Sequence, residues 1–290
     1  MIKVIIMDID GTLLNNEKQL TVETKEALLK AQDDGVLLVL ASGRPYNGLV
    51  HLGNELNMNK HNGLFVCFNG SKVLNYQTGD ILFNNAISVE DAKKIFDHLD
   101  KFDGCRPMVD HGEYMYVNNV FDNYIHYSQG PAKYTHDGLF DVMQYESRGN
   151  SYKLCEIDHL SNWVSEPVNK ILTYGDPDYL KDNYEAIYAP FKDKVNAMFT
   201  APFYYEFTAK GIDKTKAIKT ALEPLNIKQD EIIAFGDAQN DKTMVEYAGV
   251  GVAMGNATDE LKEVADYITD DNNHDGIAKA LYKYLPEIFD

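Results

Sequence analysis

Two carboxylates, Asp8 and Asp10, lie one residue apart near the start of the chain, where a mostly apolar run over residues 2–6 gives way to polar residues. In an extended segment residues i and i+2 point the same way, so both side chains can share one site. Neighbouring carboxylates repel each other and burial adds to the cost, so such a pair persists where a cation compensates it. A hard divalent cation with a preference for oxygen ligands, such as Mg²⁺, fits this position.

Two further polar clusters follow apolar runs that read as buried strands. Ser42 follows the run 36–41, and the acidic and amide cluster 237–241 follows the run 232–235. In an open parallel sheet, ligands bind beyond the carboxyl ends of the strands, so we expect these clusters to converge there with Asp8.

The predicted clusters carry complementary chemistry. Carboxylates hold the cation, while the Ser42 hydroxyl and the backbone amides of Ile9 and Gly43 can donate to phosphate oxygens. Lys214, at the start of a predicted helix, can supply a positive charge.

The surrounding elements predict a discontinuous α/β domain. Almost wholly apolar strands alternate with helices at both ends of the chain, which indicates a Rossmann-like, doubly wound parallel sheet covered on both faces. From about residue 80, Tyr-rich strand-like segments with turn residues indicate an α+β insert built on an antiparallel sheet. We therefore expect a core of residues 1–83 and 208–290 and an inserted domain of residues 84–207.

Composition excludes several classes of function. The formal net charge is -18, which argues against nucleic acid and anionic membrane surfaces as partners. Three widely spaced cysteines, no leader-like N-terminus and no membrane-length apolar run favour a cytoplasmic protein. We expect a monomer or a weak homodimer.

The motifs together resemble those of the haloacid dehalogenase superfamily. Its signatures are DxDxT, a Ser or Thr after the second strand, a Lys, and GDxxND. The matching residues here are Asp8–Thr12, Ser42, Lys214 and Gly236–Asp241. The segments Ser42–Pro45, Asn69–Gly70 and Ala253–Ala257 are similar to those of the Cof-type subfamily (HAD-IIB), which includes sugar phosphatases. One departure is Thr215, where these proteins often have Gly.

This resemblance implies a fold, a mechanism and a ligand set. The insert would be a C2B-type cap that closes over the crevice and sets the substrate range. Asp8 would be the nucleophile and form an aspartyl-phosphate, and Asp10 would be the general acid and base, its pKa raised by Asp8 and apolar surroundings. Mg²⁺ would bind Asp8, the Asp10 carbonyl and Asp237.

The resemblance also assigns the groups that hold the phosphate and support the lysine. Ile9, Ser42, Gly43, Lys214 and Asn240 would bind the phosphate. Asp241 would support Lys214 from behind.

Each of these residues also has a purely structural explanation when taken alone. Ser42–Gly43 can be a turn before a helix, Lys214 a solvated helix residue, and Asp237 and Asn240 helix caps. Arg44 can either contact the substrate or pair with a carboxylate, and we favour the pairing. Asn69–Gly70 fits a hairpin turn about as well as a substrate contact.

The sequence predicts a Mg²⁺-dependent phosphatase acting on small phosphate monoesters, with sugar phosphates as the expected substrates. A sugar phosphomutase is the first alternative, since it shares the aspartyl-phosphate. A non-catalytic phosphosugar-binding protein is the second, although binding alone does not need Asp10.

Overall fold

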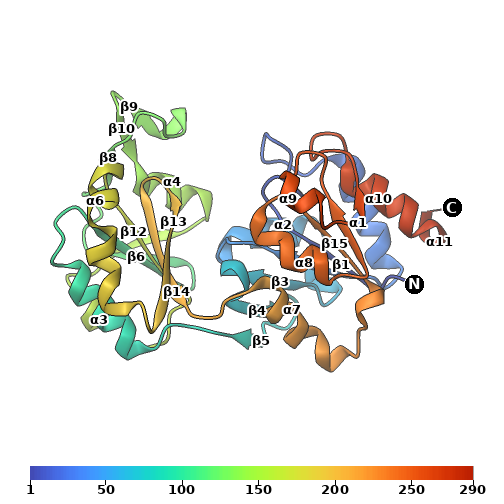
Figure 1. Cartoon of the computed structure of the whole chain (residues 1–290), viewed down its shortest axis with the longest axis horizontal. Helices are drawn as coiled ribbons and strands as arrows, with labels where there is room; N and C mark the ends of the chain where they lie inside the picture. Colours follow the sequence, from blue (N-terminus) through green and yellow to red (C-terminus); the bar gives the residue numbers. More distant parts are fainter. Residues whose placement is uncertain (290) are drawn as a thin grey trace. The chain divides into compact units, whose positions relative to one another are not determined.

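The computed structural model describes residues 1–289, which form two compact units (Figure 1). Unit 1 comprises Met1–Asn84 and Ile212–Asp290, and unit 2 comprises Asn85–Gly211. The chain returns to unit 1 after Gly211 rather than after residue 207, because strand β14 (Tyr204–Ala209) continues past that residue.

Unit 1 is built on an eight-stranded sheet with the order β17-β16-β15-β1-β2-β3-β4-β5. The strands from β17 to β3 are parallel, whereas β4 and β5 are added antiparallel at one edge. The strands are β1 (Val4–Met7), β2 (Leu37–Ala41), β3 (Leu64–Cys67), β4 (Lys72–Asn75), β5 (Ile81–Asn84), β15 (Ile232–Gly236), β16 (Val250–Ala253) and β17 (Tyr267–Ile268).

Helices cover both faces of this sheet, which confirms the doubly wound α/β prediction. Alternate residues of β1 face opposite sides: Ile5 packs towards α1, α2 and α10, whereas Ile6 packs towards α7 and α8. The helices are α1 (Val22–Asp33), α2 (Asn47–Glu55), α7 (Lys214–Leu222), α8 (Lys242–Tyr247), α9 (Asp259–Lys262), α10 (Gly276–Tyr284) and α11 (Pro286–Phe289).

Unit 2 contains a six-stranded sheet with the order β11-β7-β6-β12-β14-β13 and a separate three-stranded sheet, β8-β10-β9. All neighbours in the larger sheet are antiparallel except β11 and β7. The strands are β6 (Arg106–His111), β7 (Tyr114–Val117), β8 (Tyr124–His126), β9 (Thr135–His136), β10 (Leu139–Asp141), β11 (Lys153–Glu156), β12 (Lys170–Tyr174), β13 (Val195–Ala201) and β14 (Tyr204–Ala209).

The helices of unit 2 pack on the larger sheet and beside the smaller one. Helix α3 starts at the cap residue Ser88, whose hydroxyl accepts a hydrogen bond from the Asp91 amide. The helices are α3 (Val89–Leu99), α4 (Val142–Gly149), α5 (Leu160–Trp163) and α6 (Pro177–Tyr188). No helix within residues 1–289 is long and apolar enough to cross a bilayer.

Candidate active site

The site is built at the carboxyl edge of the parallel strands in unit 1. Strand β1 pairs in parallel with both β15 and β2, so the residues that follow each strand meet at one edge. Asp8 follows β1, Ser42 follows β2 and Asp237 follows β15. The sequence prediction that these three polar clusters converge is therefore consistent with the strand pairing.

Lys214 joins two of these elements through its ammonium group. Its Nζ lies 2.6 Å from Asp8 Oδ1 and 2.7 Å from Asp241 Oδ1. The side chain of Lys214 is 1% exposed, and those of Asp8 and Asp241 are 10% and 0% exposed. Helix α7 positions the lysine from its first residue, with Asp213 as the cap that accepts from the Lys216 amide.

The charges at this ion pair shift the titration of its members. Burial raises the pKa of Asp8 to about 7, and Lys214 offsets part of this effect while Asp241 adds to it. Burial opposes the charge on Lys214, but the two carboxylates outweigh it and raise its pKa. Lys214 is therefore a fixed positive charge beside Asp8.

Three carboxylates form a group that fits a divalent cation. One oxygen each from Asp8, Asp237 and Asp241 lies within 4.8 Å of the others. An all-oxygen donor set suits Mg²⁺.

The three carboxylates differ in how many of their oxygens already accept hydrogen bonds from the protein. Both oxygens of Asp241 are used, Oδ1 by Lys214 and Oδ2 by the amides of Asp237 and Ala238. Asp8 Oδ2 and Asp237 Oδ2 have no hydrogen-bond donor among residues 1–289, whereas Asp237 Oδ1 accepts from Thr12 at 2.7 Å. The free oxygens therefore favour Asp8 and Asp237 as ligands over Asp241.

Gly11 brings the loop after β1 close to Asp237. It adopts a left-handed conformation with φ 92°, and a Cβ at this position would lie 2.4 Å from Asp237 Oδ2. Glycine is therefore required here both by the backbone conformation and by the close approach.

Asp10 points its carboxylate at two cations. Arg44 donates from Nε to Asp10 Oδ2 and from Nη2 to Oδ1, both at 2.8 Å, and Lys18 Nζ lies 2.7 Å from Oδ1. Burial raises the pKa of Asp10, but Arg44 and Lys18 outweigh it and lower the pKa below its usual value. The prediction of a raised Asp10 pKa is thus wrong, and the prediction that Arg44 pairs with a carboxylate is confirmed.

Backbone amides and small polar groups complete the edge. Ser42 is buried, and its hydroxyl accepts from the Arg44 amide at 3.2 Å. Within the described chain, the amides of Ile9 and Gly43 make no hydrogen bond to another backbone group, which leaves them available as donors to an anion.

Asn69 connects the remaining predicted residues. Asn240 Nδ2 donates to Asn69 Oδ1 at 3.3 Å, and a Cβ on Gly43 would lie 3.1 Å from Asn69 Nδ2. The segment around Asn69 and Gly70 is the turn between the antiparallel strands β3 and β4, which supports the hairpin interpretation. A Cβ on Gly70 would lie 2.5 Å from the Asp213 carbonyl, so this turn also packs against the start of α7.

Lys18 lies outside every motif of the sequence, yet it contacts Asp10. Its contact with Asp10 depends on the path of the loop after β1, where Lys18 itself has a φ of 59°. No spacing rule predicts such a contact. Asn256, noted only as part of a motif, donates from Nδ2 to the Gly11 carbonyl at 2.8 Å.

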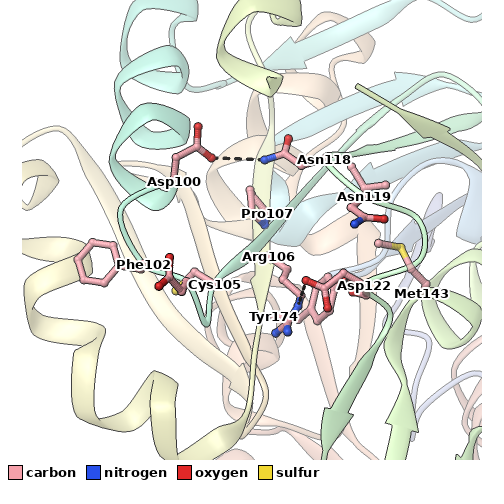
Figure 2. A pocket seen from close by; sticks show the side chains of 12 residues that line it. Asp100, Phe102, Cys105, Arg106, Pro107, Asn118, Asn119, Asp122, Met143 and Tyr174 are labelled. Atoms are coloured by element: carbon pink, nitrogen blue, oxygen red, sulfur yellow. Dashed lines mark hydrogen bonds and ion pairs between the residues drawn. The ribbon is translucent and has the colours of Figure 1, made fainter. Parts of the chain in front are cut away.

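Unit 2 has a polar cavity of its own, of about 200 Å³ (Figure 2). It lies where β6 begins and β7 and β12 end. Arg106 Nε lies 2.6 Å from Asp122 Oδ2, and Asn118 donates to Asp100 at 3.3 Å. Tyr174 closes this arrangement by donating its hydroxyl to the Asp122 carbonyl at 2.6 Å. None of the predicted site residues lines this cavity.

The chain belongs to the family of haloacid dehalogenase-like hydrolases, whose sequence profile matches residues 5–281. The 5-amino-6-(5-phospho-D-ribitylamino)uracil phosphatase YcsE of Bacillus subtilis (strain 168) is 31% identical over 288 residues, covering 98% of this chain and 96% of that protein. The chain is a phosphatase-type hydrolase of this superfamily.

Solved structures agree with this assignment. A haloacid dehalogenase-like hydrolase from Bacteroides thetaiotaomicron superposes with a TM-score of 0.87 at 31% identity, covering 98% of this chain and 99% of that one. The HAD subclass IIB sugar phosphatase BT4131 gives a TM-score of 0.70 at 24% identity, covering 97% of this chain and 98% of that one. The second similarity concerns the fold alone.

Proposed function

We propose that this protein is a Mg²⁺-dependent phosphatase that hydrolyses small phosphate monoesters, chiefly sugar phosphates, through an aspartyl-phosphate on Asp8. The observation that carries the proposal is the asymmetry of the Asp8 carboxylate. Its Oδ1 accepts from Lys214 at 2.6 Å, while its Oδ2 has no donor among the described residues. One oxygen is thus held in place, and the other is left for the phosphoryl group or the cation.

The metal-binding residues in this proposal are Asp8, the backbone carbonyl of Asp10, and Asp237. When bound, Mg²⁺ neutralises charge on the carboxylates and on the phosphoryl oxygens. Lys214 adds a fixed positive charge beside Asp8. Such local charge is what an anionic substrate needs on a chain with a formal net charge of -18.

In the first step, an Asp8 oxygen attacks phosphorus, and the bond between phosphorus and the ester oxygen breaks. Asp10 gives its proton to the leaving alkoxide oxygen, so the alcohol departs neutral. The Asp10 carboxylate is bound to Arg44 and Lys18 at 2.7–2.8 Å, which favours its ionised form. Asp10 therefore has to move out of these contacts, at least in part, before it can carry the proton.

In the second step, Asp10 takes a proton from a water molecule, and the water oxygen attacks phosphorus. The bond between phosphorus and Asp8 breaks, which releases inorganic phosphate and restores the Asp8 carboxylate. Splitting the hydrolysis in this way lets one carboxyl group serve first as acid and then as base.

The phosphoryl oxygens are held by the amides of Ile9 and Gly43, the Ser42 hydroxyl, Lys214 and Asn240. These groups provide positioning and charge neutralisation, which are the main requirements of phosphoryl transfer. The Asn240–Asn69 hydrogen bond at 3.3 Å orients Asn240. Asp241 supports Lys214 and the amides that follow β15.

The inserted unit acts as the cap and sets the substrate range. It carries a largely buried ion pair in which Lys170 Nζ lies 3.2 Å from Glu206 Oε2, and Glu146 accepts from Asn150 at 2.9 Å. YcsE is named for a phosphorylated ribityl compound, which is consistent with a polyol or sugar phosphate as substrate.

The test is a panel of sugar, polyol and nucleotide phosphates assayed for phosphate release with and without Mg²⁺. We expect hydrolysis of several sugar or polyol phosphates with Mg²⁺ only, and none by Asp8→Asn. Stoichiometric release of free phosphate excludes a pure mutase. Absence of any turnover would contradict the proposal.

A further inference from the structure

Two asparagines from the C-terminal part of unit 1 hold the loop that follows β1. Asn256 Nδ2 donates to the Gly11 carbonyl at 2.8 Å, and Asn272 Nδ2 donates to the Leu14 carbonyl at 2.9 Å. Both donors lie more than two hundred positions away in the sequence from the carbonyls that they bind. Long-range contacts thus add to the local hydrogen bonds of the loop, such as those from the amides of Leu13 and Leu14 to the carbonyls of Asp8 and Ile9.

The two asparagines are also joined to each other. The backbone N–H of Asn272 donates to the side-chain oxygen Oδ1 of Asn256 at 3.1 Å. The side-chain amide of Asn256 therefore makes two hydrogen bonds: its oxygen accepts from the Asn272 backbone, and its nitrogen donates to the Gly11 carbonyl. Asn272 is buried with 5% of its surface exposed, whereas Asn256 lies at the surface. The buried member orients the exposed member.

Both bound carbonyls belong to residues that follow Asp10, the residue proposed to transfer the proton. Gly11 directly follows Asp10, so its carbonyl belongs to the second peptide unit after the Asp10 side chain. The side chain of the next residue, Thr12, donates to Asp237 at 2.7 Å. The side chains that bind the Asp10 carboxylate are partly exposed, with Lys18 62% and Arg44 22% exposed.

We propose that Asn256, oriented by Asn272, is a positioning residue that fixes the backbone of the Asp10 loop for acid–base chemistry. This proposal rests on the phosphatase function proposed above. When the Asp10 carboxyl group leaves Arg44 to reach the ester oxygen, it keeps the orientation needed for proton transfer only if the Asp10 backbone stays in place. A misplacement of about 1 Å at such a group can cost on the order of a hundredfold in rate.

The key variant is Asn256→Asp, which is nearly isosteric. An aspartate retains an oxygen that accepts from the Asn272 amide but loses the donor to the Gly11 carbonyl. Asn256→Ala is the second variant, because it removes the same donor without adding charge. The matched control is Asn15→Asp in the same loop. Asn15 Oδ1 accepts from the amides of Glu17 and Gln19, and an aspartate keeps both bonds.

The readout is steady-state kinetics with a sugar phosphate that the wild-type protein hydrolyses, measured across pH, with thermal unfolding alongside. We expect kcat to fall about tenfold or more in Asn256→Asp and Asn256→Ala, with KM within about twofold of wild type. We also expect a shifted pH profile of kcat and an unfolding midpoint within a few degrees of the control. Asn15→Asp should keep the wild-type kcat within about twofold.

The possible results separate the two proposals. An active wild-type protein whose Asn256 variants match Asn15→Asp in kcat overturns the positioning role and leaves the phosphatase function intact. A loss confined to KM, or one explained by a lowered unfolding midpoint, overturns it as well. A wild-type protein without Mg²⁺-dependent hydrolysis overturns the proposed function, and the positioning role falls with it.

Discussion

Arg44 donates two hydrogen bonds to the Asp10 carboxylate, from Nε to Oδ2 and from Nη2 to Oδ1, both 2.8 Å long. Paired bonds of this kind between a guanidinium and a carboxylate are among the stronger polar contacts in proteins. The proposed general acid is therefore held in its ionised form until substrate binding changes its surroundings. The pH dependence of turnover should report how firmly this ion pair holds Asp10.

Lys18→Met should move the basic limb of the pH profile of kcat/KM to higher pH. Lys18 and Arg44 lower the pKa of Asp10, so removing one positive charge raises that pKa towards its ordinary value. Because the acid must be protonated to act, a higher pKa extends activity to higher pH. Lys60→Met, which removes an exposed lysine elsewhere in unit 1, should leave the limb in place. An unmoved limb in Lys18→Met would show that Lys18 does not control Asp10.

Lys214→Met should destabilise the metal-free protein by about 3–5 kcal/mol, because it leaves Asp8 and Asp241 buried without their cation. Urea unfolding checks this, with Lys216→Met, an exposed lysine of the same helix, as the control. We also expect turnover to fall by several orders of magnitude. A Lys214→Met protein as stable as the control would mean that the pair contributes little to folding.

In the metal-free protein, the contribution of Asp8 to the free energy of unfolding should fall as the pH rises from about 4 to about 7. The folded-state pKa of Asp8 is raised from 3.8 to about 7, so the fold favours the protonated form. The stabilisation from this shift is complete below the unfolded-state pKa and is lost as pH rises through the folded-state pKa. Denaturant unfolding of wild type and Asp8→Asn at several pH values isolates the contribution. If the free energy of unfolding changed with pH equally in the two proteins, the predicted contribution of Asp8 would be contradicted.

Lys170→Met should destabilise the inserted unit by about 2–4 kcal/mol, because Glu206 is only 7% exposed and loses its cation. Lys170 holds its charge because Glu206 and Glu146 outweigh the effect of burial and raise its pKa. Lys192→Met, at an exposed position of the same unit, is the control. Hydrogen exchange along β12 and β14 measures the loss locally. Unchanged exchange would show that the ion pair is neutral for folding.

Most of the framework could be predicted from the sequence because the parallel strands are short, apolar runs that end in polar residues. Asp8, Ser42 and Asp237 follow such runs, and their placement depends only on strand order and direction. Lys214 was identified from motif order, and its contacts with Asp8 and Asp241 agree with the roles expected of all three.

The features that sequence could not predict depend on loop paths and on short elements. The sequence predicts the wrong direction for the pKa of Asp10, because it shows the neighbouring Asp8 but not the contacts of the carboxylate with Arg44 and Lys18. The sequence does not predict the sheet β8-β10-β9, because strands of two or three residues are too short to show an alternation of apolar and polar residues. The support given by Asn256 and Asn272 arises from residues at the far end of the chain.

The central claim is that the phosphoryl group passes through Asp8, and trapping that intermediate tests it most directly. Enzyme mixed with Mg²⁺ and a hydrolysed sugar phosphate is quenched in acid and reduced with borohydride, which converts an aspartyl-phosphate to homoserine. We predict homoserine at position 8, absent without substrate and absent in Asp8→Asn. Undiminished turnover by Asp8→Asn, or homoserine at another aspartate with Asp8 unmodified, would contradict the account.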